Sequence, residues 1–306
     1  MEARELADER APLGGAPRGS WTISPQASLA DRCSARAGPA LLALPSALLM
    51  IVFFVVPVAM ILRQSLLAPD LTLEFYRRIV TLPVYGLVFW ISFKIALLSA
   101  IVSMAASYPV AYTLLVVRPL SRSIMLAIIL VPFWTNVLIR CYAWILILQK
   151  NGVANTILVD WLHVVSQPLP LLFNLTSVLI GLVYYLVPVN ILVLYTAMQR
   201  IDLRLLKAAQ GLGADPLKAF AAVFLPLSMP GVWAAATLIF VVALGFFVTP
   251  ALLGGSHEIT IAMQVNTYFT ETVDWGLGSA LATALLALAL AGIGLSRAFQ
   301  RAAAVR

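Results

Sequence analysis

Residues 200–226 read RIDLRLLKAAQGLGADPLKAFAAVFLP and stand between two long apolar blocks, 171–198 and 231–253. This is the longest polar interruption between apolar blocks in the second half of the chain. Its charged residues alternate with Leu, Ala and Phe at near-helical spacing, which a simple spacer would not require. The stretch therefore predicts a folded element that stands outside the membrane while both of its flanks cross it.

Two short helices are expected within this stretch. Asp202 suits the N-cap of the first, and Gly211 or Gly213 can adopt the left-handed backbone that ends it. Asp215 and Pro216 then offer an N-cap and a first helical position for the second. The apolar side of the first helix consists of Leu203, Leu206, Ala208 and Ala209. We predict a compact knob of two helices that meet at a glycine.

Composition places most of the remaining chain in lipid. Of 306 residues, 62% are hydrophobic and only 11% are charged, more apolar surface than a soluble core of this length could hide. The apolar residues fall in blocks of about 20, the length that a helix needs to cross a bilayer. A soluble enzyme is excluded. The net charge of +7 is dispersed over short loops rather than clustered with aromatic residues, so nucleic acid is not an expected partner.

The sequence predicts an all-α membrane protein with three parts. Residues 1–39 lack periodicity and are expected to form a disordered cytoplasmic tail. Residues 40–297 form a transmembrane domain with a cytoplasmic loop at 199–230, and residues 298–306 form a cytoplasmic C-terminal end. The six predicted spans are Ala40–Leu62, Gly86–Val117, Ser123–Gln149, Leu171–Met198, Gly231–Leu253 and Gly278–Ser296. A short interfacial helix is also expected within the outer loop 69–82.

Loop charges predict the orientation. Fourteen Lys and Arg residues lie in the tail, the loops 118–122 and 199–230 and the C-terminal end, whereas four lie in the opposite loops. By the positive-inside rule, the termini and the knob are cytoplasmic. The remaining two cations, Lys94 and Arg140, fall inside predicted spans. Both are costly to bury and are therefore functional candidates, although Lys94 is close enough to the outer end of its span to snorkel.

The knob resembles the EAA loop of permease subunits from binding-protein-dependent ABC importers. Ala208-Ala209, Gly213, Val223 and Leu225-Pro226 occupy that motif's anchor positions at matching spacing, while its glutamate is replaced here by Lys207. The resemblance implies the ABC type I importer permease fold, with the knob seated in a separate ATP-binding subunit. Lys207, Ala208, Ala209, Gly213, Asp215, Leu225 and Pro226 are the implied coupling residues.

This resemblance also implies partners and a mechanism. The partners are an ATPase dimer, a homologous second permease subunit, a periplasmic solute-binding protein and the lipid of a bacterial inner membrane. No Walker A motif occurs, because Gly213-Ala-Asp-Pro-Leu-Lys218 lacks the second glycine before the lysine. The chain is therefore expected to be non-catalytic and to need no cofactor or metal, and transport is expected to proceed by alternating access.

Further stretches resemble the first-subunit type of spermidine/putrescine permease. They are Pro132-Phe-Trp-Thr-Asn-Val-Leu-Ile-Arg-Cys-Tyr-Ala-Trp144, Tyr108-Pro-Val-Ala-Tyr112 and Phe247-Val-Thr-Pro-Ala-Leu-Leu-Gly-Gly255. A polyamine is the solute that this resemblance implies. No Asp or Glu occurs in the predicted spans, so aromatic faces would have to stabilise the cation. The candidate pathway residues are Trp134, Arg140, Tyr142, Trp144 and Phe246.

Two alternatives remain open from the sequence. Related importers carry opines, aminophosphonates and other small solutes, and Arg140 suits an anion. A stand-alone secondary transporter is a rival of a different class, but it would be expected to show intramembrane carboxylates or inverted repeats with broken helices.

Overall fold

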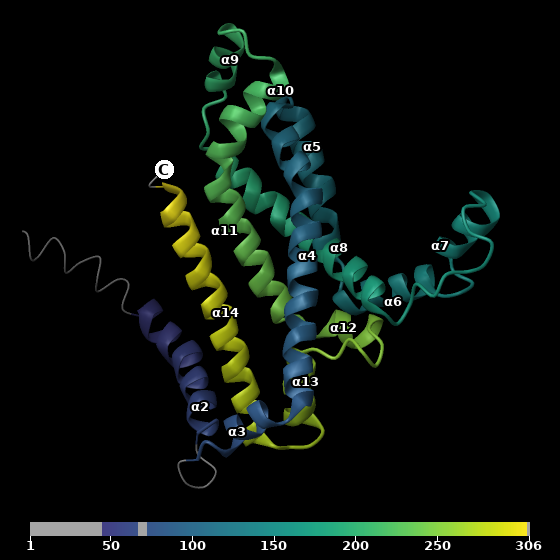
Figure 1. Ribbon diagram of the computed structural model, residues 1–306, viewed down its shortest axis with the longest axis vertical. Coiled ribbons are helices and arrows are strands. Elements are labelled where there is room, and N and C mark those ends of the chain that lie inside the picture. The colour runs from purple at the N-terminus through teal and green to yellow at the C-terminus, as the bar shows by residue number, and fades with distance from the viewer. Residues whose placement is uncertain (1–44, 67–71, 305–306) are drawn as a thin grey trace, which may run out of the picture. The chain divides into compact units, whose positions relative to one another are not determined.

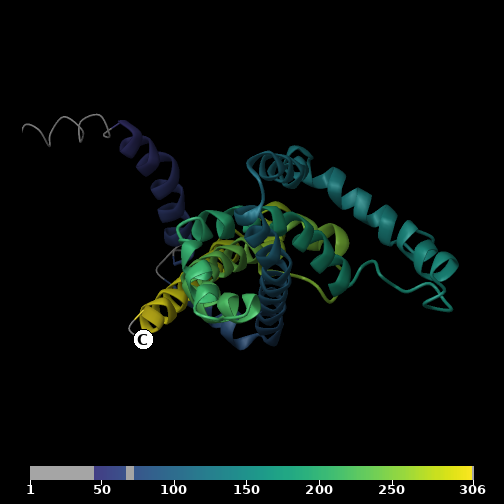
Figure 2. The ribbon, with the colours of Figure 1, turned by 90° about the horizontal axis from the view of Figure 1, so that it is seen from above.

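The computed structural model describes residues 45–66 and 72–304, and the figures show it in two orientations (Figures 1 and 2). The tail predicted at residues 1–39 lies outside the described residues. The helices and their bounds are η1 Ile51–Val55, α2 Val56–Gln64, α3 Glu74–Thr81, α4 Pro83–Val116, α5 Pro119–Leu130, η2 Val131–Trp134, α6 Val137–Leu148, α7 Val153–Thr156, η3 Ile157–Trp161, α8 Leu175–Met198, α9 Arg204–Gly211, α10 Pro216–Ala219, η4 Phe220–Phe224, α11 Leu225–Leu244, α12 Val248–Leu253, α13 Ile261–Thr270 and α14 Trp275–Ala304.

Among the described residues, five continuous helical stretches are long and apolar enough to cross a membrane. They are Pro45–Gln64, Pro83–Val116, Leu175–Met198, Pro216–Leu244 and Trp275–Ala298. A sixth crossing results if the bent pair Pro119–Trp134 and Val137–Trp161 counts as one span. The first stretch includes the boundary at Pro57 between the chain's two compact units, and none of the side chains in η1 and α2 is buried. The all-helical membrane fold predicted from the sequence is confirmed.

The third predicted span differs from expectation because it is broken. The two halves of the pair meet at 94°. Pro132 lies in the tight turn η2, Thr135 is extended, and the Asn136 side chain accepts a hydrogen bond from the Leu138 backbone N–H at 2.8 Å. A side-chain cap of this kind begins a new helix. In consequence, α6 runs outward from α8 instead of continuing α5 (Figure 2).

The bounds of the fifth span also differ from the prediction. The helical stretch begins at Pro216, within the knob, and continues through the π-helical turn η4 into α11. It ends at Leu244, because the chain turns at Gly245 and resumes as the short α12. The knob's second helix and this span are therefore one continuous element, and a displacement of the knob can pass directly to the span.

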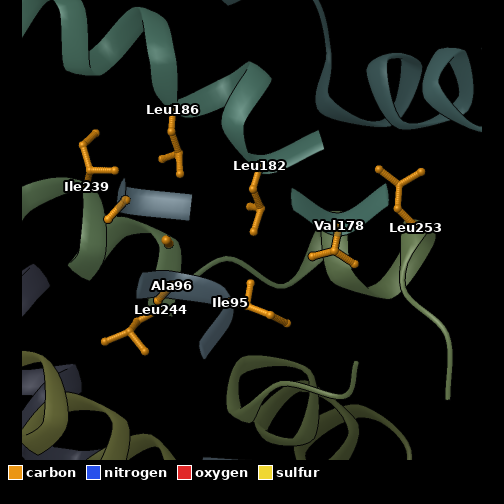
Figure 3. Close-up of a cluster of buried hydrophobic side chains, with 10 residues drawn as sticks. Ile95, Ala96, Val178, Leu182, Leu186, Ile239, Leu244 and Leu253 are labelled. Carbon is orange, nitrogen blue, oxygen red and sulfur yellow. The ribbon is translucent and has the colours of Figure 1, made fainter. Parts of the chain in front are cut away.

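The main core lies where α4, α8 and α11 meet. Ile95 and Ala96 of α4 pack with Leu182 and Leu186 of α8 and with Ile239 of α11, and each of these side chains is at most 1% exposed (Figure 3). Small residues allow close approach of helices. A Cβ at Gly231 would meet the Cβ of Ala197, so α8 and α11 could not pack as closely with a larger residue there.

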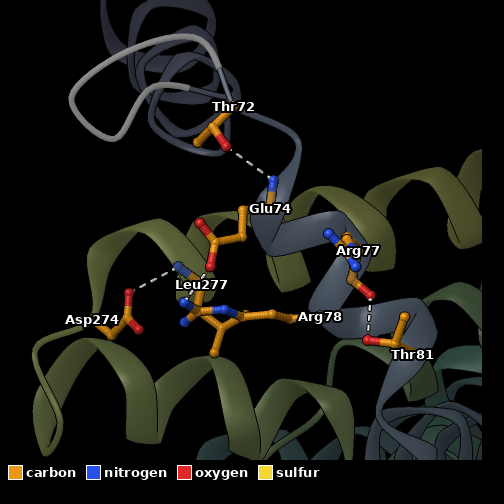
Figure 4. Close-up of polar contacts among 7 residues, drawn as sticks. All are labelled: Thr72, Glu74, Arg77, Arg78, Thr81, Asp274 and Leu277. Carbon is orange, nitrogen blue, oxygen red and sulfur yellow. Dashed lines mark hydrogen bonds and ion pairs between the residues drawn. The ribbon is translucent and has the colours of Figure 1, made fainter.

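The short helix expected in the loop 69–82 is present as α3. Its Phe75 and Ile79 pack against a cluster formed by the N-terminal turns of α4 and α14 together with Ile261 of α13. On its polar side, Arg78 pairs with Glu74 at 2.5 Å (Figure 4). Nearby, Asp274 caps α14 by accepting from the Leu277 N–H at 3.0 Å. Helix α3 therefore has one apolar face on the bundle and one charged face toward solvent, as expected at a membrane surface.

Candidate functional site: the coupling knob and an aromatic cluster

Helix α9 forms the first half of the knob. It begins at Arg204, whose backbone N–H donates to the Asp202 carboxylate at 2.9 Å. Asp202 therefore accepts a bond from the first residue of the helix, but the N-cap position itself is Leu203, one residue later than predicted. Leu206 is buried and Lys207 is exposed. Leu206 thus anchors α9 on the protein, whereas Lys207 and Ala208 face solvent.

Gly213 ends this first half. It has a φ of +91°, in the left-handed region, and its N–H donates to the Gln210 carbonyl at 3.0 Å. The Ala214 N–H donates to the Ala209 carbonyl at 3.1 Å, which satisfies another carbonyl at the helix end. Of the two glycines proposed from the sequence, Gly213 is the one that adopts this conformation. A Cβ there would meet no atom within 4 Å, so the backbone alone requires glycine.

The second half begins at Pro216. Asp215 is in the N-cap position with extended backbone, but its side chain makes no capping hydrogen bond. The position predicted from the sequence is therefore correct, and the expected side-chain bond is not formed. Because the Asp215 carboxylate is exposed, it is available to a partner.

An aromatic seat near the C-terminal end of α4, formed by Tyr108 and Tyr112, packs against the knob. Tyr112 packs edge-to-face against Phe220 and Phe224, with ring centroids 5.2 and 4.9 Å apart. One turn earlier, the Tyr108 hydroxyl lies 2.8 Å from that of Ser228. The Tyr108–Tyr112 motif was identified from the sequence only by resemblance. In the structure it connects the knob to α4.

The free face of the knob combines small residues with two large apolar ones. Ala208, Gly211 and Gly213 are exposed. Leu212 is 90% exposed and Leu217 is 73% exposed. Exposed leucines beside exposed Ala and Gly residues are expected where another protein docks closely. The sequence prediction did not include either leucine, although both stand within the quoted stretch.

The pathway candidates separate into two groups. Arg140 and Phe246 come together around Tyr185 of α8, with the Arg140 guanidinium carbon 5.1 Å and the Phe246 ring 4.8 Å from the Tyr185 ring centroid. Phe133 lies 6.1 Å from the same ring. We name Phe133, Arg140, Tyr185 and Phe246 the aromatic cluster. Tyr185 was not among the pathway residues predicted from the sequence. The only sequence signal for it is the pair Tyr184-Tyr185, inside a span that contains Pro188.

The other candidates lie elsewhere. Trp144 packs edge-to-face on Tyr184 at 5.6 Å and contacts the main core. Trp134 is 91% exposed and Tyr142 is 61% exposed, and neither joins the aromatic cluster. Within the described residues, no group of three His, Cys, Asp or Glu side chains is placed to hold a metal ion. The rings of the aromatic cluster could stabilise a cationic solute. The positive charge of Arg140 would oppose that stabilisation.

The fold and the knob define a class of membrane permease, and comparison with known proteins gives its family. The family model for binding-protein-dependent transport system inner membrane components matches residues 106–305. The spermidine/putrescine transport system permease protein PotB of Haemophilus influenzae is 35% identical over 78% of this chain and 86% of its own length. The Escherichia coli PotB is 34% identical over 77% of this chain and 88% of its own. The chain belongs to this family of inner-membrane components and is an ABC importer permease.

Solved structures agree in fold. A bacterial ABC transporter involved in the import of alginate has a chain that superposes with a TM-score of 0.72 at 14% identity, covering 89% of this chain and 98% of that one. The methionine ABC transporter MetNI gives a TM-score of 0.53 at 18% identity, covering 70% of this chain and 93% of that one. The type I ABC importer permease fold expected from the sequence is confirmed.

Proposed function

We propose that this chain is the permease subunit of an ATP-driven importer of polyamines such as spermidine and putrescine. The observation that carries the importer mechanism is the knob: a Gly213-terminated helix pair, seated on α4 and continuous with α11. The polyamine assignment is supported by the likeness to PotB over most of the chain. The residues proposed to couple with the ATPase are Lys207, Ala208, Ala209, Gly213, Asp215, Leu225 and Pro226.

In this proposal ATP is hydrolysed by a separate ATPase dimer. When that dimer closes, it displaces the knob, and the movement passes through η4 into α11 and through Tyr112 into α4. A homologous second permease subunit completes the passage, and a periplasmic binding protein delivers the solute. A crystal structure of the alginate transporter includes a periplasmic protein, which supports this kind of partner. Inverting a 1:99 conformational equilibrium takes about 5.5 kcal/mol of differential binding, so the knob must be firmly held.

The proposed orientation places both termini and the knob in the cytoplasm. Cysteine introduced at Gly211 should react with a membrane-impermeant maleimide only after the cells are permeabilised, because the cytoplasmic loops carry most of the Lys and Arg. Cysteine at Asn151, which is exposed in the loop after α6, should react in intact cells. The reverse pattern would contradict the orientation, and labelling of both sites in intact cells would contradict the six-span topology.

The charge of Arg140 discriminates between polyamine and anion import. Its guanidinium stacks on Tyr185, while its Nε is buried without a hydrogen-bond partner among the described residues. In a polyamine importer this cation has a structural role, since it would repel the solute. Arg140→Ala should then lower the amount of assembled complex, at a cost of about 1–2 kcal/mol for the lost cation–π contact, without changing which solute is carried.

Reconstituted complexes, normalised to assembled subunits, should be given spermidine, putrescine and an aminophosphonate. Parent uptake of the polyamines and weak assembly of Arg140→Ala support the proposal. An Arg140→Ala complex that assembles fully but is inactive, together with a parent that takes up only the aminophosphonate, would replace the polyamine assignment with the anion alternative. Uptake that follows an ion gradient without ATP would instead indicate a secondary transporter.

A further inference from the structure

Lys94 lies on an exposed apolar stripe of α4. Leu87, Trp90, Leu97 and Ile101 share one side of the helix with it at the spacing of a helical face, and these four are 40–62% exposed. Lys94 is itself exposed and makes no hydrogen bond or ion pair with another residue that the structure describes. A positive charge therefore stands on a membrane-facing surface that is otherwise apolar.

The depth of Lys94 limits what can neutralise it. The cluster that holds helix α3 extends along α4 to Phe89. Lys94 is five residues further along the helix, a separation of about 7.5 Å. A Lys side chain spans roughly 6 Å, so snorkelling alone does not bring its ammonium group to the level of the cluster that holds α3. A lipid headgroup is thus a poor partner for it.

A groove continues from the same stripe toward the cytoplasmic side. It has a volume of ≈ 600 Å³ and lies between α4, α11 and α14. Leu97 and Ile101 belong both to the stripe and to the groove. Small side chains, including Ala100, Ala105 and Gly292, line its floor and walls, as is typical where transmembrane helices pack closely. Its lining is almost wholly apolar, and Thr237 and Ser296 hydrogen-bond to each other.

We propose that this groove receives a transmembrane helix of the second permease subunit, and that an Asp or Glu on that helix pairs with Lys94. The inference rests on the proposed function, which supplies the second subunit. Charge complementarity selects the occupant, since an unpaired cation at this depth is costly. A second copy of this chain is a poor source of the partner, because its five long apolar helices contain no Asp or Glu and the bent pair has only Asp160, one residue from its end at Trp161.

Co-purification of the second subunit with tagged full-length chain, extracted from native membranes, tests the proposal. Lys94→Leu should lower the amount of second subunit recovered by about fivefold, the effect of losing 1 kcal/mol of a polar contact between helices, and Lys94→Glu should lower it further. If nothing pairs with Lys94, Lys94→Leu should instead assemble as well as the parent or better, since it removes an expensive charge. That result would overturn the proposal and favour lipid.

Two further comparisons make the test specific. Ala105→Phe fills the groove and should reduce recovery, whereas Ala106→Phe, at an exposed neighbour outside the groove, should not. Replacing the intramembrane acidic residue of the second subunit with Lys should restore recovery with Lys94→Glu. Failure of every such exchange would overturn the charge pair. A parent complex that contains the second subunit but transports no polyamine refutes the proposed solute and leaves this interface standing.

Discussion

Gly213→Asp is expected to abolish transport while leaving the protein in the membrane at normal abundance. The left-handed backbone at this position disfavours any side chain by about 1–2 kcal/mol, and the structure shows open space around it, so no core contact is lost. In the complex, an added carboxylate would meet the ATP-binding subunit. Uptake by reconstituted complex and immunodetection of the chain in membranes measure the two parts of this prediction.

Neighbouring alanine substitutions separate the backbone effect from the added charge. Gly213→Ala should give partial activity, because it carries only the backbone strain. Gly211→Ala should retain more activity than Gly213→Ala, because Gly211 lies within α9, where alanine is favoured over glycine by about 1 kcal/mol and the backbone is not strained. Normal uptake by Gly213→Asp at normal abundance would show that the knob does not dock where we propose.

Tyr112→Ala is expected to uncouple ATP hydrolysis from transport. Its ring contacts Phe220 and Phe224, the buried part of the knob's second half. Removing it loses two edge-to-face contacts, about 0.5–1.5 kcal/mol each beyond the lost burial. The knob can still bind the ATPase, but its movement no longer passes rigidly to α4. Hydrolysis should continue while the polyamine taken up per ATP falls severalfold.

Tyr112→Phe is the matched control for this prediction. It keeps the ring, and the Tyr112 hydroxyl has no hydrogen bond among those found in the described residues, so the ratio of transport to hydrolysis should be unchanged. An unchanged ratio in Tyr112→Ala as well would mean that the aromatic seat does not transmit the knob's movement.

Sequence periodicity and spacing predicted the knob well because its signals are local. A glycine that must be left-handed and an Asp-Pro pair act within a few residues. The break at Asn136 was missed because apolarity dominated that block, although a capping side chain beside Pro132 was present. Tyr185 was missed for a different reason. Its role depends on Arg140 and Phe246 converging from other helices, and no sequence spacing encodes that meeting.

The groove beside Lys94 shows the same limit. From the sequence, Lys94 was predicted to lie inside a span. Because that span was predicted to begin at Gly86, the Lys94 side chain was expected to reach the membrane surface by snorkelling. The structure begins α4 at Pro83 and packs α3 against its first turns, from which we infer that Lys94 lies deeper. Helix length alone could not give this depth, because it depends on where a separate segment packs.

Spermidine uptake into proteoliposomes tests the central claim most directly. The vesicles should hold this chain together with its second permease subunit and ATPase, with ATP enclosed and the binding protein outside. Uptake should require both ATP and the binding protein, and it should stop when ATP is replaced by a non-hydrolysable analogue. Spermidine uptake that continues without ATP, driven by a proton or sodium gradient, would contradict the assignment of this chain to an ATP-driven importer.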